Sequence, residues 1–176
     1  IAGQKVHYVV YDDATDTTTA VQNVKRLVSE EKADMLIGPS TSPTCAAVIE
    51  AVAASKTPMI QLSPGPAAIP ANDEKRKWIF NAPANTTIYA TAMISHMIKK
   101  GVKTVSVIAV DDAYGETSTV AYKTLSESKG IKTLTVEKYK RTDTSATAQV
   151  LRAMQGNPDA IYIVSAGTPA ALPHVA

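Results

Sequence analysis

Three hydroxyl side chains stand together where a short apolar run gives way to a helix-like stretch: Ser40, Thr41 and Ser42. The run 34–38 is typical of a buried strand, and 43–55 has the apolar spacing of a helix. Ligands of open parallel sheets bind outside the carboxyl ends of the strands. The first amides of a helix are unpaired and partly positive, so together with these hydroxyls they favour a small anion such as a carboxylate. The alternative interpretation is that Thr41 or Ser42 only caps the helix.

A second group of small and hydroxyl residues has the same setting near the end of the sequence. Its members are Ser165, Gly167 and Thr168. They follow the apolar run 160–164 and precede an alanine-rich helix start. Tyr114 comes soon after another apolar run, 104–110, and would supply an apolar wall from the neighbouring strand end. The sequence therefore predicts two loops, each at the carboxyl end of a strand, that could bind one small ligand.

Two pairs of acidic residues also follow predicted strands: Asp12 with Asp13, and Asp111 with Asp112. One interpretation is a Mg²⁺ site like that of phospho-accepting receiver domains. Such a domain also needs a third Asp and a Lys at later strand ends, and the stretch "IGPS" offers no Asp. Solvated loop acids and helix caps are the favoured interpretation. For Asp111 and Asp112, contact with a ligand stays open because they neighbour Tyr114.

The common enzyme motifs are missing from the sequence. Ser40 lies in GPSTS and not in G-x-S-x-G, and no G-x-G-x-x-G follows a strand. The three histidines share no motif, and Cys45 is the only cysteine, so it can form neither an internal disulfide nor a metal site alone. The net charge is +2 and the lysines are spread along the chain, which argues against nucleic acid as a partner. These residues therefore give no ground for a hydrolase or a dinucleotide site, and we predict no cofactor and no bound metal.

The elements that would position these residues alternate along the 176-residue chain, which is 45% hydrophobic and can bury a core. Apolar and β-branched runs predict strands at 5–13, 34–38, 57–62, 77–83, 104–110, 131–139 and 160–164. Helical spacing predicts helices between them, including one capped by Thr17 or Thr18 and others over 43–55, 86–100 and 145–155. Such alternation is typical of parallel βαβ units, so the predicted fold class is α/β.

The two halves of the sequence match each other at one constant offset. It places Ala20 on Ala146 and Val24 on Val150, and it runs without a gap until 35–37 falls on 161–163. We therefore expect these two short runs to be equivalent, buried strands. The second half also has a strand and a helix before the repeated unit, for which the first half has no counterpart. The sequence is thus expected to be a fragment of a longer two-lobed protein.

The stretch "YDDATDTTTAVQNVKRLVSEEKADMLIGPSTSPTCAAVIEAVAASKTPMIQLSPG" resembles the type I periplasmic solute-binding proteins of ABC transporters. It is most similar to the leucine/isoleucine/valine-binding class, which also includes binders of aromatic acids. Further matches are "IFNAPANTT", "VSVIAVDDAYGE" and "PDAIYIVSAGTPAALP". The resemblance rests on the order and spacing of these stretches over essentially the whole chain. It implies two Rossmann-like lobes with parallel sheets, 1–82 and 83–176, both incomplete and joined by a hinge. It also implies no catalysis.

The resemblance also implies which residues contact the ligand. They are Ser40, Thr41, Ser42, Ser63, Gly65, Ala67, Tyr114, Ser165, Gly167 and Thr168. Family members hold the ligand carboxylate at the positions of 40–42 and lay an aromatic residue, here Tyr114, against the ligand. Amino acid binders of this class carry a hydroxyl residue near Ala67 or Ala68. The two alanines depart from that pattern, which weakens the case for recognition of an α-ammonium group.

The function that this resemblance implies is capture of a small carboxylate, either an amino acid or an aromatic or aliphatic acid, in a cleft between the lobes. The protein would then deliver it to the membrane permease of an ABC importer. The resemblance also implies a periplasmic or extracellular protein, made with a signal peptide and in some cases lipid-anchored. A ligand-sensing domain of a receptor or regulator is the alternative. An isolated fragment would expose an unpaired sheet edge, so we expect a homodimer or poor solubility.

Overall fold

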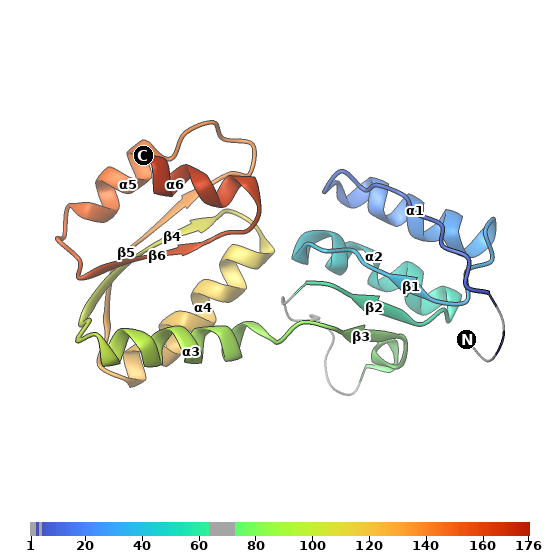
Figure 1. The fold of residues 1–176 in the computed structure, drawn as a ribbon, viewed down its shortest axis with the longest axis horizontal. Helices are drawn as coiled ribbons and strands as arrows, with labels where there is room; N and C mark the ends of the chain where they lie inside the picture. The colour runs from blue at the N-terminus through green and yellow to red at the C-terminus, as the bar shows by residue number, and fades with distance from the viewer. Residues whose placement is uncertain (1–2, 4, 64–72) are drawn as a thin grey trace. The chain divides into compact units, whose positions relative to one another are not determined.

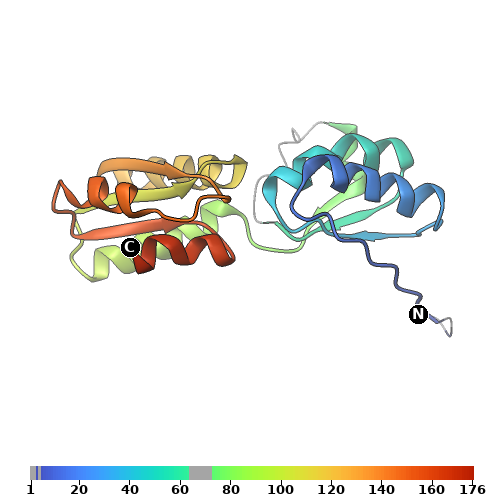
Figure 2. The same cartoon turned by 90° about the horizontal axis from the view of Figure 1, so that it is seen from above.

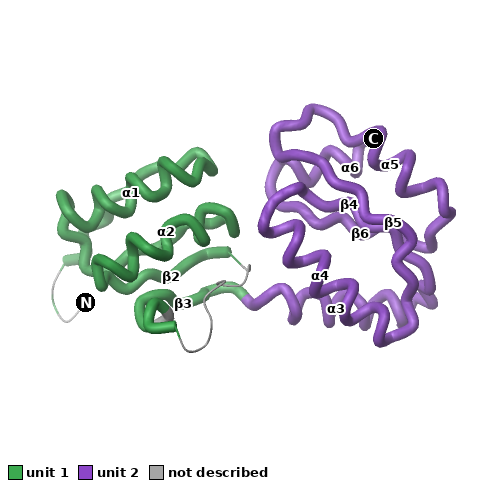
Figure 3. The backbone as a smooth tube through the Cα atoms, turned by 180° about the vertical axis from the view of Figure 1, so that it is seen from behind, with its two compact units in different colours: residues 1–83 green, residues 84–176 purple. Residues whose placement is uncertain are grey.

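The computed structural model describes residues 3, 5–63 and 73–176. The chain divides into two compact units, unit 1 over residues 1–83 and unit 2 over residues 84–176 (Figure 3). Each unit is an α/β structure with its own three-stranded parallel sheet, so the predicted fold class is confirmed. Two residues named above as ligand contacts, Gly65 and Ala67, lie outside the described residues.

Unit 1 is a small parallel sheet with two helices on one face. The elements are α1 (Thr17–Ser29), β1 (Leu36–Ile37), α2 (Ser42–Ser55), β2 (Met59–Gln61), the 3₁₀ helix η1 (Glu74–Trp78) and β3 (Ile79–Asn81). The strand order is β1-β2-β3, and the cross-strand row Leu36, Met59 and Ile79 is buried. This row packs with Val24 of α1 and Val48 of α2, and both helices lie on the same side of the sheet (Figure 2).

The opposite face of this sheet carries a second apolar row. Ile37, Ile60 and Phe80 lie side by side in register on neighbouring strands. Ile37 is 58% exposed and Phe80 is 53% exposed, because none of the described helices of unit 1 covers this face. The expectation that 35–37 is buried throughout is therefore wrong, since only Leu36 points into the core. A parallel sheet usually has both faces covered, so the exposure of this row is an exception.

The strand predicted for 5–13 does not form. Its residues have no sheet partner, and Val6, Tyr8 and Val10 are exposed. The repeat aligns 5–13 with β5 (Lys132–Tyr139) of unit 2, and β5 pairs with the central strand β4 (Thr104–Val110) alone. Within the described part of unit 1 no strand takes the place of β4, so the segment lacks the neighbour that would make it a strand.

Unit 2 is a three-layered structure with helices on both faces of its sheet (Figure 1). Besides β4 and β5 its elements are α3 (Thr86–Lys99), α4 (Ala113–Ser128), α5 (Thr147–Met154), β6 (Ala160–Val164), the 3₁₀ helix η2 (Thr168–Ala171) and α6 (Leu172–Val175). The strand order is β5-β4-β6. Val105 and Val107 of β4 pack in the cluster that includes α3 and α4, whereas Ile108 packs with Val150 of α5. The central strand is thus buried on both sides.

The N-cap of helix α1 lies one residue before the first predicted cap position, Thr17. Asp16, rather than Thr17 or Thr18, is the N-cap, and its Oδ1 accepts hydrogen bonds from the Thr19 amide at 2.7 Å and the Thr19 hydroxyl at 2.8 Å. These bonds stabilise the ionised carboxyl group and lower the pKa of Asp16. A carboxylate accepts from the first amides more strongly than a neutral hydroxyl, which explains why the acid takes this position.

Candidate functional site

The loop from β1 to α2 carries the first group of hydroxyls, and Thr41 is the N-cap of α2. Its side chain makes no capping bond to the helix amides. The Thr41 and Thr44 hydroxyls lie 2.8 Å apart, and the Thr44 hydroxyl donates to the Thr41 carbonyl oxygen at 3.0 Å. The interpretation of Thr41 as a simple side-chain cap is therefore wrong, and the first amides of α2 are left to other acceptors.

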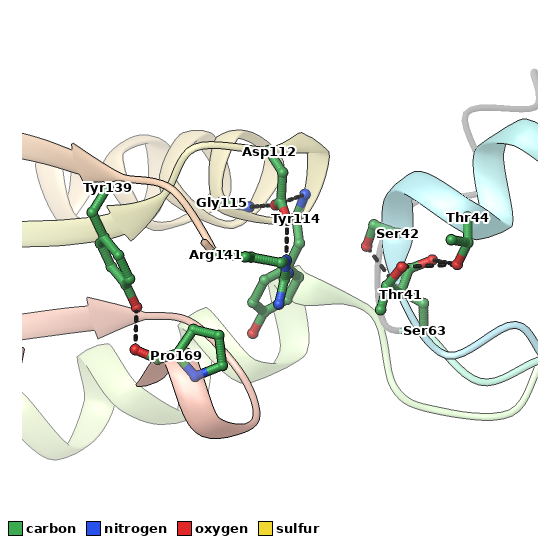
Figure 4. A network of polar contacts seen from close by, with 10 residues as sticks. All are labelled: Thr41, Ser42, Thr44, Ser63, Asp112, Tyr114, Gly115, Tyr139, Arg141 and Pro169. Carbon is green, nitrogen blue, oxygen red and sulfur yellow. Dashed lines mark hydrogen bonds and ion pairs between the residues drawn. The ribbon is translucent and has the colours of Figure 1, made fainter. Parts of the chain in front are cut away.

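Ser42, the first residue of α2, pairs with a hydroxyl from the end of the neighbouring strand. Its Oγ lies 2.7 Å from the Oγ of Ser63, and the two residues are only 7% and 1% exposed (Figure 4). The parallel pairing of β1 with β2 brings the two loops together, and the Leu62 amide donates to the Pro39 carbonyl oxygen at 3.0 Å. The structure thus unites two segments that the sequence analysis proposed separately. Ser40 lies exposed beside them.

Cys45 lies one turn into α2, beneath this loop. Its thiol donates to the Pro39 carbonyl oxygen at 3.3 Å, and its side chain is buried. Burial raises the pKa of the Cys45 thiol to about 11, because the thiolate would be poorly solvated. The interpretation of Cys45 as a small apolar residue of the helix fits this position.

We expect the Cys45 thiol to be unreactive in the folded protein. At pH 8 a thiol with a pKa of about 11 is roughly one part in a thousand thiolate, against about a quarter for a free cysteine. A chromogenic disulfide reagent should therefore label the native chain at least about 100-fold more slowly than the chain in urea. Because the sequence has a single cysteine, the signal reports on this site alone. Equal labelling rates with and without urea would contradict the burial of this thiol.

The carboxyl edge of unit 2 is organised by Asp112, the N-cap of α4. Its Oδ1 accepts from the amides of Tyr114 at 2.9 Å and Gly115 at 3.1 Å (Figure 4). A Cβ atom built on Gly115 would lie 1.7 Å from the Val110 carbonyl oxygen, so only glycine lets the helix start so close to the end of β4. Tyr114 is half-buried, and burial is the main cause that raises the pKa of its phenol.

Arg141 joins this edge from the turn after β5, and it is not among the residues predicted from the sequence. Its Nε donates to Oδ2 of Asp112 at 2.6 Å, and both side chains are largely buried. The guanidinium lies close enough to Tyr114 to oppose the rise in the pKa of that phenol. The sequence signal that could have found it is a basic residue just after the predicted strand 131–139. In the sheet this strand lies next to β4, the strand that precedes Asp112.

The second group of small residues follows β6 at the same edge. The Tyr139 hydroxyl, at the end of β5, donates to the Pro169 carbonyl oxygen at 2.9 Å and ties this loop to the sheet (Figure 4). Gly167 has φ +69°, a left-handed conformation that favours glycine. The Ser165 hydroxyl is buried without a hydrogen-bond partner among the described residues, and Thr168 is exposed. The Thr168 hydroxyl is thus accessible at this edge, whereas the Ser165 hydroxyl is covered by the protein.

The remaining acids have local structural roles. Asp12 and Asp13 accept bonds at 2.8 Å from the backbone amides of Ala14 and Thr15, and these bonds shape the loop before α1. Asp111 lies 3.5 Å from the ammonium group of Lys138. In the described part of the chain no cluster of three or more His, Cys, Asp or Glu residues is placed to hold a metal ion. The acid pairs therefore fit the interpretation of loop acids and caps.

The sequence matches the family described as periplasmic binding protein over residues 1–174. The match covers nearly the whole chain. The chain belongs to the periplasmic binding protein family. Members of this family are periplasmic or extracellular binding proteins, and the comparison accounts for the two α/β units described above. No helix in the described residues is both long and apolar enough to cross a membrane.

Solved structures support this membership. An extracellular ligand-binding receptor from Rhodopseudomonas palustris HaA2 is 40% identical, with a TM-score of 0.94 over 99% of this chain and 48% of that one. The leucine-binding protein LivK from Thermotoga maritima MSB8 is 26% identical, with a TM-score of 0.82 over 92% of this chain and 45% of that one. A solute-binding protein of an ABC transporter from R. palustris, in complex with 4-hydroxybenzoate, is 21% identical and shares the fold, with a TM-score of 0.87 over 99% and 47%.

The chain thus spans about half the length of these solved structures. A search of curated proteins found no match.

Proposed function

We propose that this chain is part of the solute-binding component of an ABC importer, which captures a small carboxylate and delivers it to a membrane permease. The observation that carries the proposal is the buried Ser42–Ser63 hydroxyl pair at the start of α2, on the carboxyl edge of the unit 1 sheet. Amides at a helix start and hydroxyl donors together stabilise a carboxylate. Unit 2 would add contacts from Tyr114, Ser165, Gly167 and Thr168 at its own carboxyl edge.

Within this proposal an acid without an ammonium group is the favoured ligand. Ala67 and Ala68 offer no hydroxyl where amino acid binders of the class carry one. Two solved proteins with the same fold have names that state complexes with 4-hydroxybenzoate and 3,4-dihydroxybenzoic acid. LivK, by contrast, is named as a leucine-binding protein. Aromatic acids are therefore the first ligands to test, with leucine as the competing class.

A thermal-shift experiment on the complete protein tests this function. A ligand that binds only the native state adds RT ln(1 + [L]/Kd), which is about 2.7 kcal/mol at 100 times Kd. We expect benzoate or 4-hydroxybenzoate to raise the melting temperature and the uncharged benzamide to leave it unchanged, because the site is built for a carboxylate. Equal stabilisation by benzamide and by the acids would contradict the proposal. So would a protein that neither the acids nor leucine stabilise.

We further propose that the isolated 1–176 chain pairs with a second copy through the uncovered sheet face of unit 1. Phe80 and Ile37 are more than half exposed there, and apolar burial yields about 25 cal/mol per Å². Phe80→Ser should therefore shift the chain from dimer or larger species to monomer, by at least about tenfold in dissociation constant.

Sedimentation velocity measures this change. Leu151→Ser is the matched control, because Leu151 is 61% exposed on α5 and lies outside the apolar row. A monomeric parent chain, or equal effects of the two substitutions, would contradict pairing through this face.

A further inference from the structure

The carboxyl edge of unit 2 holds a guanidinium with unused donors. The bond from Nε of Arg141 to Asp112 is the only hydrogen bond that this side chain makes within the described residues. The two terminal nitrogens thus keep four N–H groups for another acceptor. The Arg141 side chain is 22% exposed, so these donors are neither lost in the core nor fully surrounded by water. Such a group is suited to bind an oxygen of a ligand that covers this edge.

The position of Arg141 is fixed from two sides. The turn that carries it is closed twice, because the Lys140 amide donates to Oδ2 of Asp143 at 2.8 Å and the Asp143 amide donates to the Lys140 carbonyl oxygen at 3.1 Å. Its partner Asp112 is in turn held by two amides at the start of α4. Little conformational freedom remains to be lost when a ligand binds, which is what a specific donor requires.

Charge alone does not explain a role for this arginine. Asp112 neutralises Arg141, so the pair attracts a distant anion only weakly. The nearby acids Asp111 and Glu116 face a cation of their own, Lys138, at 3.5 and 2.9 Å. Selection by Arg141 must therefore come from the direction of its N–H groups beside the ring of Tyr114 and not from net charge.

We propose that Arg141 is a specificity-determining residue, which donates hydrogen bonds from its terminal nitrogens to a ligand oxygen other than those of the carboxylate that the proposed function assigns to the ligand. This inference rests on the proposed function, because that function assigns the ligand carboxylate to other donors. The ligand class that follows is an aromatic acid with a second oxygen acceptor, either a ring hydroxyl or a second carboxylate. Tyr114 would lie against the ring.

Calorimetry on the complete protein with three probes tests this assignment. Benzoate has one acceptor group, 4-hydroxybenzoate adds a ring hydroxyl, and terephthalate adds a second carboxylate. Arg141→Lys keeps the positive charge beside Asp112 but removes the guanidinium fork. We expect it to weaken binding of the preferred two-acceptor acid about 10- to 100-fold and that of benzoate less than about threefold. Which of the two larger acids loses affinity identifies the second acceptor.

Arg152→Lys is the matched control. Its Nε also donates to a carboxylate at 2.6 Å, that of Glu137, in the same unit but away from the loops at the carboxyl edge. It should change the affinity for all three probes by less than about threefold. Melting temperatures of both variants show whether unit 2 is folded, and Arg141→Gln provides a second variant if the lysine variant is unstable.

The outcomes separate the two proposals. If the acids bind the parent protein and Arg141→Lys binds them equally well, or loses all three to the same extent, the role of Arg141 is overturned and the proposed function stands. If neither the acids nor leucine bind the parent protein, the proposed function fails and the inference fails with it.

Discussion

Gly115→Ala is expected to destabilise unit 2 by about 2–4 kcal/mol. Helix propensity alone predicts the opposite sign, since alanine in a helix is better than glycine by roughly 1 kcal/mol. Here the new Cβ would lie 1.7 Å from the Val110 carbonyl oxygen, a backbone atom at the end of the central strand. Neither atom can move without displacing α4 or β4, so the steric cost exceeds the gain in propensity.

Urea denaturation followed by circular dichroism measures the loss. Val120→Ala is the control, because Val120 lies on the same helix and is 53% exposed. It should change stability by less than about 0.5 kcal/mol. If Gly115→Ala left the free energy of unfolding unchanged or raised it, the close contact between α4 and the end of β4 would be refuted.

Ser42→Ala is expected to weaken ligand binding by the complete protein about 10- to 150-fold. The variant removes one member of the buried hydroxyl pair at the start of α2, where we place the carboxylate. Loss of one hydrogen bond to a charged group costs about 1.5–3 kcal/mol, which converts to that range of affinity. Calorimetry with the acid that gives the largest thermal shift is the measurement.

Ser106→Ala separates binding from folding. The Ser106 hydroxyl is also fully buried and donates to the Ala153 carbonyl oxygen at 2.7 Å, so its loss costs a comparable part of the stability. Because it lies inside the sheet of unit 2, the affinity should stay within about threefold of the parent value. If the Ser42→Ala and Ser106→Ala variants bound the acid equally tightly, the Ser42–Ser63 pair would stabilise the fold without contacting the ligand.

The sequence predicted the regular elements well where the pattern is local. The runs 104–110 and 160–164 are strands with the predicted bounds. The first is the central strand, and its β-branched residues are buried on both faces, whereas the second lies at the edge of the sheet and is only partly buried. A similar run at 5–13 does not form the predicted strand. Its pattern is equally typical of a strand, but a strand exists only with a hydrogen-bonded neighbour, and a local pattern cannot supply that neighbour.

The candidate site was also predictable only in part, because local patterns can be read from the sequence and long-range strand pairing cannot. Loops at carboxyl ends of strands could be located, but the Ser42–Ser63 bond joins residues 21 positions apart and depends on the pairing of β1 with β2. The local signal of Arg141 is only its position just after a predicted strand, which does not reveal its partner. Its role depends on Asp112, 29 positions away, and only the pairing of β4 with β5 brings the two together.

The carboxylate of Asp112 has one practical consequence for anyone who wishes to redesign this protein as a biosensor for a new acid. One of its oxygens holds the start of α4 and the other holds Arg141. A library randomised at 112 would therefore mix variants that have lost the helix start with variants that have gained a new preference. Randomising residue 141 while Asp112 is retained would keep the amides at the start of α4 bonded. Differences among the variants would then report on ligand preference and not on loss of the helix start.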